Sequence, residues 1–263
     1  MPGFHRKIIF ASRGCSTGRI LSRACLEDDF HRFRLEMTAD DTHILEISGS
    51  ALRYPYSTCP QAVNGLDALI GQSVADYSAS IHRQTDASLN CTHLLDLAGL
   101  CCSHIKMDVT KRQYEIFISD RHDGETTGKY KAQISQNGQS ILSWDAENET
   151  IFSPYGFQGV NLRAGFAKWA FENLDMEMRE IALILRRCAM ISMGRAKNLK
   201  EETHAADWGF CYSQQKDRAH TALRVGGSIQ DFNSNPSKLC EEDTLWINDL
   251  SKQNVKISSH RAI

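Results

Sequence analysis

An acid and an imidazole stand beside an apolar row in the segment Cys25–Met37 (CLEDDFHRFRLEM). If this segment is one β-strand, alternation puts Asp29 and His31 on the same face as its apolar residues, Phe33, Leu35 and Met37. Burying such groups is costly without partners, and proteins accept that cost mostly in structural networks and active sites. The functional interpretation makes His31 a general acid or base that Asp29 orients. The structural alternative is an Asp–His–Arg cluster, or a strand whose first half is exposed.

The residues opposite this strand suggest a pocket wall. A hairpin that closes over Thr38–Thr42 and returns along His43–Tyr54 pairs positions whose numbers sum to about 80. Phe33 would then face Ile47. The three alternate positions before Phe33 would pair as His31 with Gly49, Asp29 with Ala51, and Glu27 with Arg53. The two small residues would leave space for a substrate, which Glu27 would help to line. Arg53 would neutralise an acid or hold an oxyanion or carboxylate.

A second histidine and acid occur in the segment Asn90–Met107, which is otherwise apolar and is predicted to be a buried helix. Helical spacing places a polar stripe on one side of it, at His93, Asp96, Leu100, Ser103 and His104. His93 and Asp96 are three residues apart and would form a second acid–base pair. The alternative is a structural role, with Asp96 in a favourable early turn and His104 at the solvent end.

A divalent metal is a further alternative for two histidines and two aspartates. Neither HxxxH nor HxH spacing occurs within one predicted element, so ligands would have to come from separate elements. We therefore expect no metal and no cofactor. Cys59 and Trp169 are candidates for lining a substrate pocket, and Cys59 could also be a nucleophile, but a buried thiol and core packing are the favoured explanations. Glu177 is expected to pair with an arginine.

The elements that must position these residues come in blocks of strands and blocks of helices. Short helices are expected at 61–70 and 74–82, further strands at 113–119, 129–135 and 139–144, and one long helix at Leu162–Met193. This order predicts an α+β fold, an antiparallel sheet with a long helix and several short helices packed on one side. Residues 1–235 are predicted to form a single catalytic or ligand-binding domain. Residues 236–263 form a polar C-terminal extension, in which Leu245–Ile247 would dock as a short helix.

Composition narrows the class of protein. The chain has 263 residues and a net charge of −2. This charge provides no overall electrostatic attraction to nucleic acid or to an anionic membrane. The longest apolar run is far shorter than the roughly 20 residues that span a bilayer. The nine cysteines are irregularly spaced without a CxxC pair, which favours reduced thiols in a cytoplasmic protein. The expected partner is a small-molecule substrate, and a homo-oligomer is left open.

Several motifs resemble the bacterial domain-of-unknown-function 2889 family: LEDDFHRF, ALRYPYSTCPQA, LIG, NCTHLLDLAGL, LRRC and CYSQQKDRAHTALRVGGSIQDF. The resemblance runs from about Phe4 to Leu239, and its most specific parts are EDDxHxF and CTHLxDL. One departure is Tyr56-Ser57, where the family pattern has a tryptophan and a threonine. The resemblance implies a common fold and a site among Asp28, Asp29, His31, Arg53, Cys59, Pro60, Cys91, Thr92, His93 and Asp96. It also suggests bacteria that degrade aromatic and steroid-like compounds.

These observations lead to one principal hypothesis and two alternatives. The principal hypothesis is a cofactor-independent lyase or isomerase, of the retro-aldol or dehydration type, for a small aromatic or otherwise apolar hydroxylated substrate. Its acid and base would be His31 and His93, oriented by Asp29 and Asp96. The alternatives are a small-molecule binding or sensing protein and a metal-dependent hydrolase or lyase.

Overall fold

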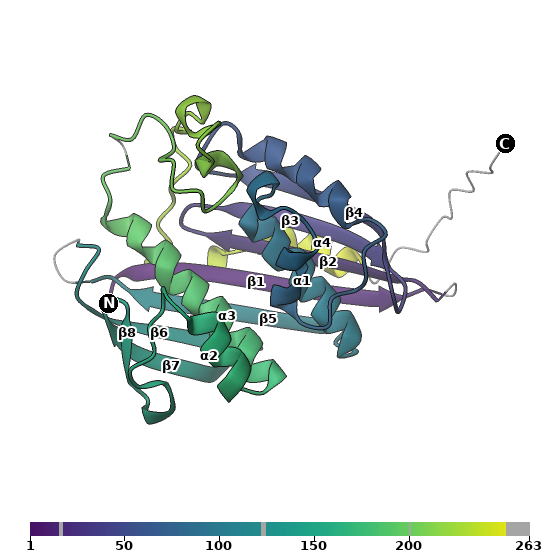
Figure 1. Ribbon diagram of the computed structural model, residues 1–263, viewed down its shortest axis with the longest axis horizontal. Helices are drawn as coiled ribbons and strands as arrows, with labels where there is room; N and C mark the ends of the chain where they lie inside the picture. The colour runs from purple at the N-terminus through teal and green to yellow at the C-terminus, as the bar shows by residue number, and fades with distance from the viewer. Residues whose placement is uncertain (16–17, 122–124, 200, 251–263) are drawn as a thin grey trace.

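A single antiparallel sheet forms the frame of the molecule in the computed structural model, which describes residues 1–15, 18–121, 125–199 and 201–250. Within these residues the sheet has eight strands, in the order β4-β3-β2-β1-β5-β6-β7-β8 (Figure 1). Their bounds are β1 Gly3–Gly14, β2 Ile20–Asp28, β3 Arg32–Ala39, β4 Ile44–Arg53, β5 Lys111–Ser119, β6 Lys129–Gln136, β7 Gln139–Glu147 and β8 Thr150–Ser153. Every neighbouring pair is antiparallel; all pairs except β1–β5 join strands that follow one another in the chain.

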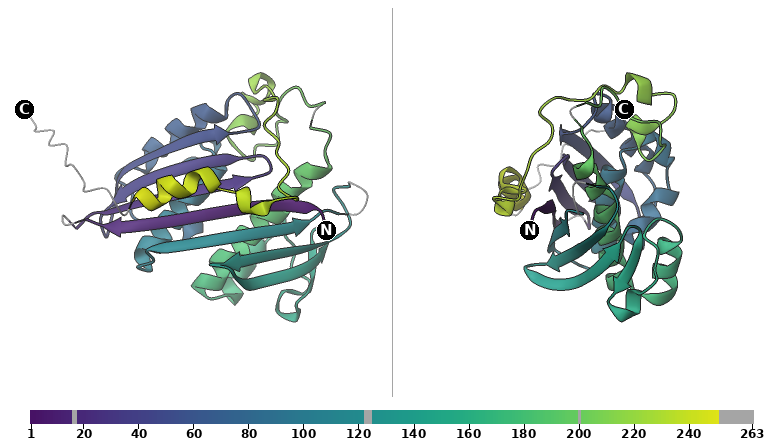
Figure 2. Two further views of the ribbon diagram at one scale, coloured as in Figure 1. Left: turned by 180° about the vertical axis from the view of Figure 1, so that it is seen from behind. Right: turned by 90° about the vertical axis from the view of Figure 1, so that its left-hand side faces the viewer.

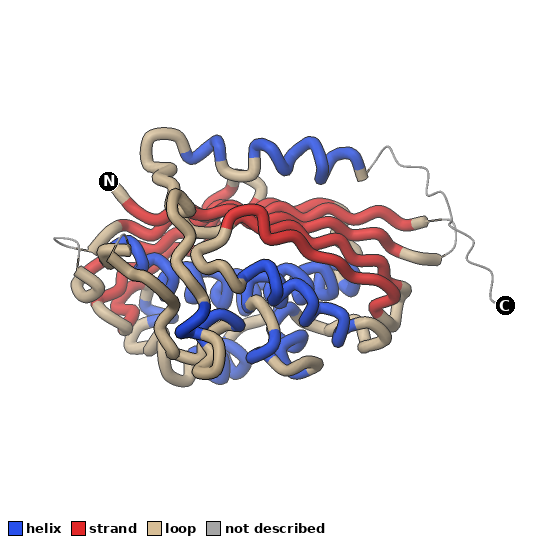
Figure 3. Tube along the Cα trace, turned by 90° about the horizontal axis from the view of Figure 1, so that it is seen from above, coloured by secondary structure: helices blue, strands red, loops and turns tan. Residues whose placement is uncertain are grey.

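Most helices cover one face of the sheet, and the C-terminal helical segment of the described residues crosses the other (Figures 2 and 3). The covered face carries α1 (Thr92–Lys106), α2 (Phe166–Asn173) and α3 (Met176–Ile191), with 3₁₀ helices η1 (Cys59–Leu69) and η2 (Ser78–Arg83). The helix on the reverse face is α4 (Glu241–Asp249). The remaining 3₁₀ turns are η3 Ala87–Leu89, η5 Tyr155–Phe157, η6 Ser192–Ala196, η7 Tyr212–Gln214, η8 Ala219–Thr221 and η9 Pro236–Lys238. The predicted α+β class is confirmed, with α4 as the exception to one-sided packing.

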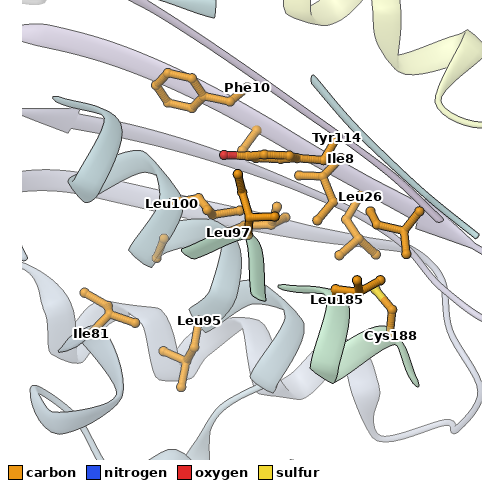
Figure 4. Close-up of a cluster of buried hydrophobic side chains, with 14 of the residues drawn as sticks. Ile8, Phe10, Leu26, Ile81, Leu95, Leu97, Leu100, Tyr114, Leu185 and Cys188 are labelled. Atoms are coloured by element: carbon orange, nitrogen blue, oxygen red, sulfur yellow. The ribbon is translucent and has the colours of Figure 1, made fainter. Parts of the chain in front are cut away.

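The main core lies between the sheet and α1 (Figure 4). Ile8, Phe10 and Leu26 supply the sheet side, and Leu95, Leu97 and Leu100 of α1 are buried against it or against the helices behind. Because α1 is covered on both sides, it is apolar around most of its circumference. Gly99 permits this cover: a Cβ there would lie 2.0 Å from the backbone oxygen of Ser78 in η2.

The segment Cys25–Met37 is two strands, not one. Strand β2 ends at Asp28 and β3 begins at Arg32, and the residues between them make a tight turn, Asp28–His31, that we call the Asp28 turn. Phe33, Leu35 and Met37 face the main core as predicted, but Cys25 faces the reverse side of the sheet, where it packs with α4. The prediction assumed that side chains alternate between the two faces of one strand through the whole segment, and the turn interrupts this alternation.

The predicted β3–β4 register is also wrong. Phe33 pairs with Ala51, Leu35 with Gly49 and Met37 with Ile47, a displacement of four residues from the expected pairing. Because four is an even number, each residue keeps its predicted face. Gly49 leaves no space beside His31, since a Cβ on it would meet Leu66 and Leu94 at 2.9 and 3.3 Å. The small residue accommodates α1 and η1 rather than a substrate.

The predicted long helix Leu162–Met193 is two helices, α2 and α3. Leu174 is extended, and Asp175 caps α3 by accepting a 2.8 Å hydrogen bond from the amide of Met178 at Oδ1. An aspartate at this position ends the continuity that periodicity alone predicts. No helix among the described residues is long and apolar enough to cross a bilayer.

The C-terminal extension contains the predicted helix, α4. Ile247 and Leu250 pack with Cys240 against Ile9, Ala11 and Cys25, whereas Leu245 is 80% exposed. Asp243 is fully buried and accepts hydrogen bonds from Arg32 and Arg34 of β3. The extension therefore covers the reverse face of the sheet; its residues 251–263 lie outside the described part.

Candidate active site

The Asp28 turn is closed by its own carboxylate. Oδ1 of Asp28 accepts hydrogen bonds from the amides of Phe30 (2.7 Å) and His31 (2.8 Å), and Oδ2 accepts from Arg6 Nε (2.9 Å) and Nη2. Burial opposes ionisation of Asp28, but the adjacent Arg6, followed by His31, outweighs it and holds its pKa well below the usual range. Asp28 is therefore a buried carboxylate that stays charged.

This carboxylate also holds the ring of His31. Nδ1 of His31 donates to Asp28 Oδ1 at 3.1 Å, and the side chain of His31 is 13% exposed. The ring lies between aromatic neighbours, with centroids 6.1 Å from Phe30 and 5.8 Å from Phe33. With Nδ1 held by this carboxylate, Nε2 is the atom of His31 that is left for proton transfer.

His93 lies directly against His31. The two ring centroids are 4.1 Å apart, and the ring of His93 is also stacked on Phe33 at 5.6 Å. Burial, and then the charges of His31 and Arg6, lower the pKa of His93 well below 6.5, so this ring is neutral near pH 7. Its Nε2 is buried without a hydrogen-bond partner among the described residues. The structure thus brings the two predicted histidines together, from the β2–β3 turn and the first turn of α1.

The two predicted aspartates lie elsewhere. Asp29 is fully buried and accepts from Arg195 Nη1 at 2.5 Å, and burial nevertheless raises its pKa to about 7. Asp96 lies 3.0 Å from His82 Nε2 and 2.8 Å from Arg187 Nε, away from His93. The residue that orients His31 is Asp28, because the turn rotates Asp29 toward η6 and Arg195.

Arg53 and Glu27 hold the backbone of the turn. Nη1 of Arg53 donates to the carbonyl oxygens of Asp29 (3.0 Å) and Ser228 (2.9 Å), and Nη2 donates to Glu27 Oε1 (3.2 Å). Glu27 Oε2 in turn accepts from the amide of Cys240 at 2.7 Å. Both side chains were predicted to contact substrate. In the structure, these atoms form hydrogen bonds within the protein and position the turn instead.

Cys59 and Trp169 do not join the histidines. Cys59 is buried with Sγ 3.3 Å from Ser213 Oγ, and burial raises the pKa of its thiol, which disfavours a thiolate nucleophile. Trp169 packs in an aromatic group with Phe157 and Phe166, at centroid distances of 5.1 and 5.8 Å. Glu177 forms the expected ion pair with an arginine, Arg112.

Sequence reasoning missed Arg6, His82 and Arg195. Arg6 had a signal: it stands in the alternating row Phe4, Arg6, Ile8, Phe10, whose other members are apolar and buried. Sequence reasoning also missed Glu180 of α3. This carboxylate accepts hydrogen bonds from Ser103 (2.6 Å), His104 (2.9 Å) and Tyr114 (2.7 Å). His104 is fully buried, so its predicted solvent position is wrong. This second cluster fastens α3 to α1 and β5.

The geometry of the described residues gives two candidate metal-ligand sets, and in each of them the carboxylate is already in use. In Asp28, His31 and His93 the ligand atoms lie within 4.8 Å of one another, as they do in Cys25, Cys240 and Asp243. Both carboxylate oxygens of Asp28 accept hydrogen bonds, and the buried Arg6 beside it repels a cation. Asp243 is likewise shared between Arg32 and Arg34. The donor chemistry favours a hydrogen-bonded acid–base group over a metal centre.

Fold and site together define an α+β protein with a buried Asp–His–His group. Residues 18–105 match the model of the family described as Protein of unknown function (DUF2889), which supports membership of the chain in that family. The match contains β2, β3, β4 and α1 and therefore both histidines, Asp28 and Arg53. No curated protein matches the chain significantly.

Proposed function

We propose that the protein is a cofactor-independent lyase of the dehydration or retro-aldol type, with His31 and His93 as its acid–base pair. The observation that carries this proposal is the contact at 4.1 Å between a His31 ring anchored on Asp28 and a neutral His93 ring. Two imidazoles with different surroundings divide the work of proton removal and proton donation between them.

In this mechanism Asp28 fixes the ring of His31 by accepting a hydrogen bond from Nδ1, so that Nε2 of His31 is the atom left for proton transfer. The neutral His93, with an unpartnered Nε2, is the base, and His31 in its protonated form is the acid. In a dehydration, His93 removes a proton from carbon, the C–O bond breaks, and protonated His31 donates a proton to the leaving oxygen so that water leaves. In a retro-aldol cleavage, His93 removes the hydroxyl proton, the C–C bond breaks with formation of a carbonyl, and protonated His31 donates a proton to the carbon that receives the electron pair.

The surroundings of the histidine pair favour an apolar substrate. Phe30 and Phe33 flank the rings, and the charge of Asp28 is balanced internally by Arg6. Aromatic rings stack on such side chains, and an internally neutral group does not select for a charged ligand. We therefore propose a small hydroxylated aromatic compound as the substrate class, in keeping with the catabolic role that the family resemblance suggests.

The experiment uses aryl compounds that carry a hydroxyl group one carbon away from an acidic C–H. Turnover is measured by mass, as loss of water or of a small aldehyde, and solvent deuterium in the product reports proton transfer to carbon. His31→Asn and His93→Gln are expected to reduce turnover by about 10²–10⁴-fold. His43→Gln is the matched control, since His43 is exposed just before β4 and its ring bonds only to Thr42 Oγ1 among the described residues.

Full turnover in either folded variant would contradict the roles of His31 and His93. Binding of a compound by the wild-type protein without a change in its mass would favour the sensing alternative. Turnover that a chelator abolishes and a divalent ion restores would favour the metal-dependent alternative. The proposal expects the rate to survive chelation.

A further inference from the structure

A cavity lies between two of the helices that cover the sheet, α1 and α3. It has a volume of about 100 Å³, is partly open, and is lined by α1, α3, η2 and strands β1 and β2. Neither His31 nor His93 lines it, so the inference below does not rest on the proposed function. Only Arg6, which pairs with Asp28, belongs to both regions.

The inner part of this cavity is hydrocarbon. Leu97 and Leu100 of α1 extend toward Ile8 and Leu26 of the sheet, as Figure 4 shows, and Leu183 and Ile184 of α3 complete the apolar walls. A water takes up about 30 Å³, and a dry 150 Å³ cavity holds benzene. The space therefore suits roughly three or four carbon atoms.

The polar part of the cavity has more positive than negative charge. Arg6 is paired with Asp28, and Arg187 with Asp96. Arg186 bonds only to backbone oxygens, those of Leu162 (2.6 Å) and Arg163 (3.4 Å), and has no carboxylate partner within the described residues. Burial, and then the charge of Arg187, lower the pKa of Arg186, and Asp96 opposes this shift. A bound anion would add a partner for this partly buried guanidinium.

We propose that this cavity binds a short-chain monocarboxylate, with its alkyl chain against Leu97, Leu100 and Ile184 and its carboxylate at Arg186. A guanidinium that is partly withdrawn from water recognises a carboxylate through charge-assisted hydrogen bonds. The apolar walls select for a chain over a bare inorganic anion. Butyrate, with three carbons beyond its carboxylate, matches the size of the space.

Butyrate is therefore the probe for the test. Binding is followed by calorimetry and by the ¹³C-methyl resonances of Leu97, Leu100 and Ile184, at constant ionic strength. Saturable shifts at these methyl groups are expected, together with binding that is at least about tenfold weaker for butyramide and for butan-1-ol, which lack the charge. Acetate should also bind more weakly, because it leaves the apolar walls uncovered.

Two variants separate charge from shape. Arg186→Gln is expected to weaken butyrate binding at least about tenfold, whereas Lys168→Gln, which alters an exposed lysine of α2 paired with Glu172, should leave it unchanged. Ala79→Leu, at the η2 wall, fills the cavity and should abolish binding with every charge in place. Equal binding of butyramide, unchanged binding in Arg186→Gln, no saturable shift, or retained binding in Ala79→Leu would each overturn the proposal. If Arg186→Gln does not fold, the amide comparison and Ala79→Leu still decide the outcome.

Discussion

A single carboxylate, that of Asp28, connects strand β1, the β2–β3 turn and the imidazole of His31. Its partners are the guanidinium of Arg6, two backbone amides and His31 Nδ1. Arg6 is 2% exposed and Asp28 is fully buried, so neither charge is hydrated well enough to remain stable without the other. The acid–base group thus depends on a buried ion pair.

Asp28→Asn is expected to destabilise the protein by about 3–5 kcal/mol, because it leaves Arg6 as an unpaired buried charge. The double variant Arg6→Met, Asp28→Asn should recover part of this loss, since no unpaired charge remains. Asp145→Asn, which breaks a half-exposed pair with Lys131, is the control and should cost less than about 1 kcal/mol. Urea denaturation measures all three, and equal losses for Asp28→Asn and Asp145→Asn would contradict the argument.

Asp29 makes stability depend on pH in a defined direction. Its pKa is about 7 in the folded protein, against 3.8 for the free group, because burial favours the neutral acid. The folded state therefore holds a proton that the unfolded state releases, so this contribution is full below pH 3.8 and is lost as the pH rises through 7. Relative to Asp29→Asn, wild-type stability should fall by about 2 kcal/mol between about pH 5 and about pH 8.

The comparison with Asp29→Asn is needed because His93 acts in the opposite direction. Its lowered pKa means that the unfolded state takes up a proton below pH 6.5 that the folded state does not, so this contribution falls as the pH falls. Subtracting the two urea curves at each pH cancels the shared effect of His93. A difference that does not change with pH would show that Asp29 is ionised throughout this range.

At the scale of elements, hydrophobic periodicity correctly predicted the features that are set within a single strand face or a single helix. Helix α1 and the core face of β3 were predicted from local pattern, and an even register error left the face of β3 intact. The Asp28 turn was not predicted, because strand alternation was carried through Asp28 and Asp29. Aspartate is a turn residue whose side chain accepts from the amide two residues on, as Asp28 does from Phe30, so a local signal for the turn was present. That turn decides that Asp28, not Asp29, orients His31.

The close packing of α1 on η2 gives a prediction at this scale. Alanine normally stabilises a helix by about 1 kcal/mol relative to glycine. Gly99→Ala should instead destabilise the protein by about 1–3 kcal/mol, since its Cβ would meet the backbone oxygen of Ser78 at 2.0 Å and backbone cannot move aside cheaply. Gly226→Ala, with nothing within 4 Å of its Cβ, is the control. Thermal unfolding distinguishes the two, and a stabilised Gly99→Ala would show that η2 yields.

The molecule as a whole joins both ends of the chain at the candidate site. Arg6 comes from the first strand, Arg195 from η6 and the amide of Cys240 from the start of α4. Alternation and helical spacing report only which face a residue takes, so they cannot name partners that lie far away in the sequence, such as Arg195, 166 residues from Asp29, or Cys240, 213 residues from Glu27. This is why both histidines could be nominated from sequence while Arg195 and Cys240, which hold the turn, could not.

Helix α4 is therefore expected to act on the Asp28 turn from the reverse face. Asp243 ties α4 to Arg32 and Arg34, and Cys240 at the start of α4 donates to Glu27, which in turn accepts from Arg53. Asp243→Ala should loosen α4 and with it the turn, so that the amides of Phe30 and His31 exchange hydrogen faster than in the wild-type protein.

Glu242→Ala is the matched control, because Glu242 is 78% exposed and its ion pair with Arg32 contributes little. The thiols of Cys25 and Cys240, both buried beneath α4, should also react faster in Asp243→Ala and not in Glu242→Ala. Faster thiol reaction without faster exchange at Phe30 and His31 would mean that α4 covers the sheet but does not hold the turn. Faster exchange at both amides, confined to Asp243→Ala, would make the C-terminal helix part of the support of the acid–base group.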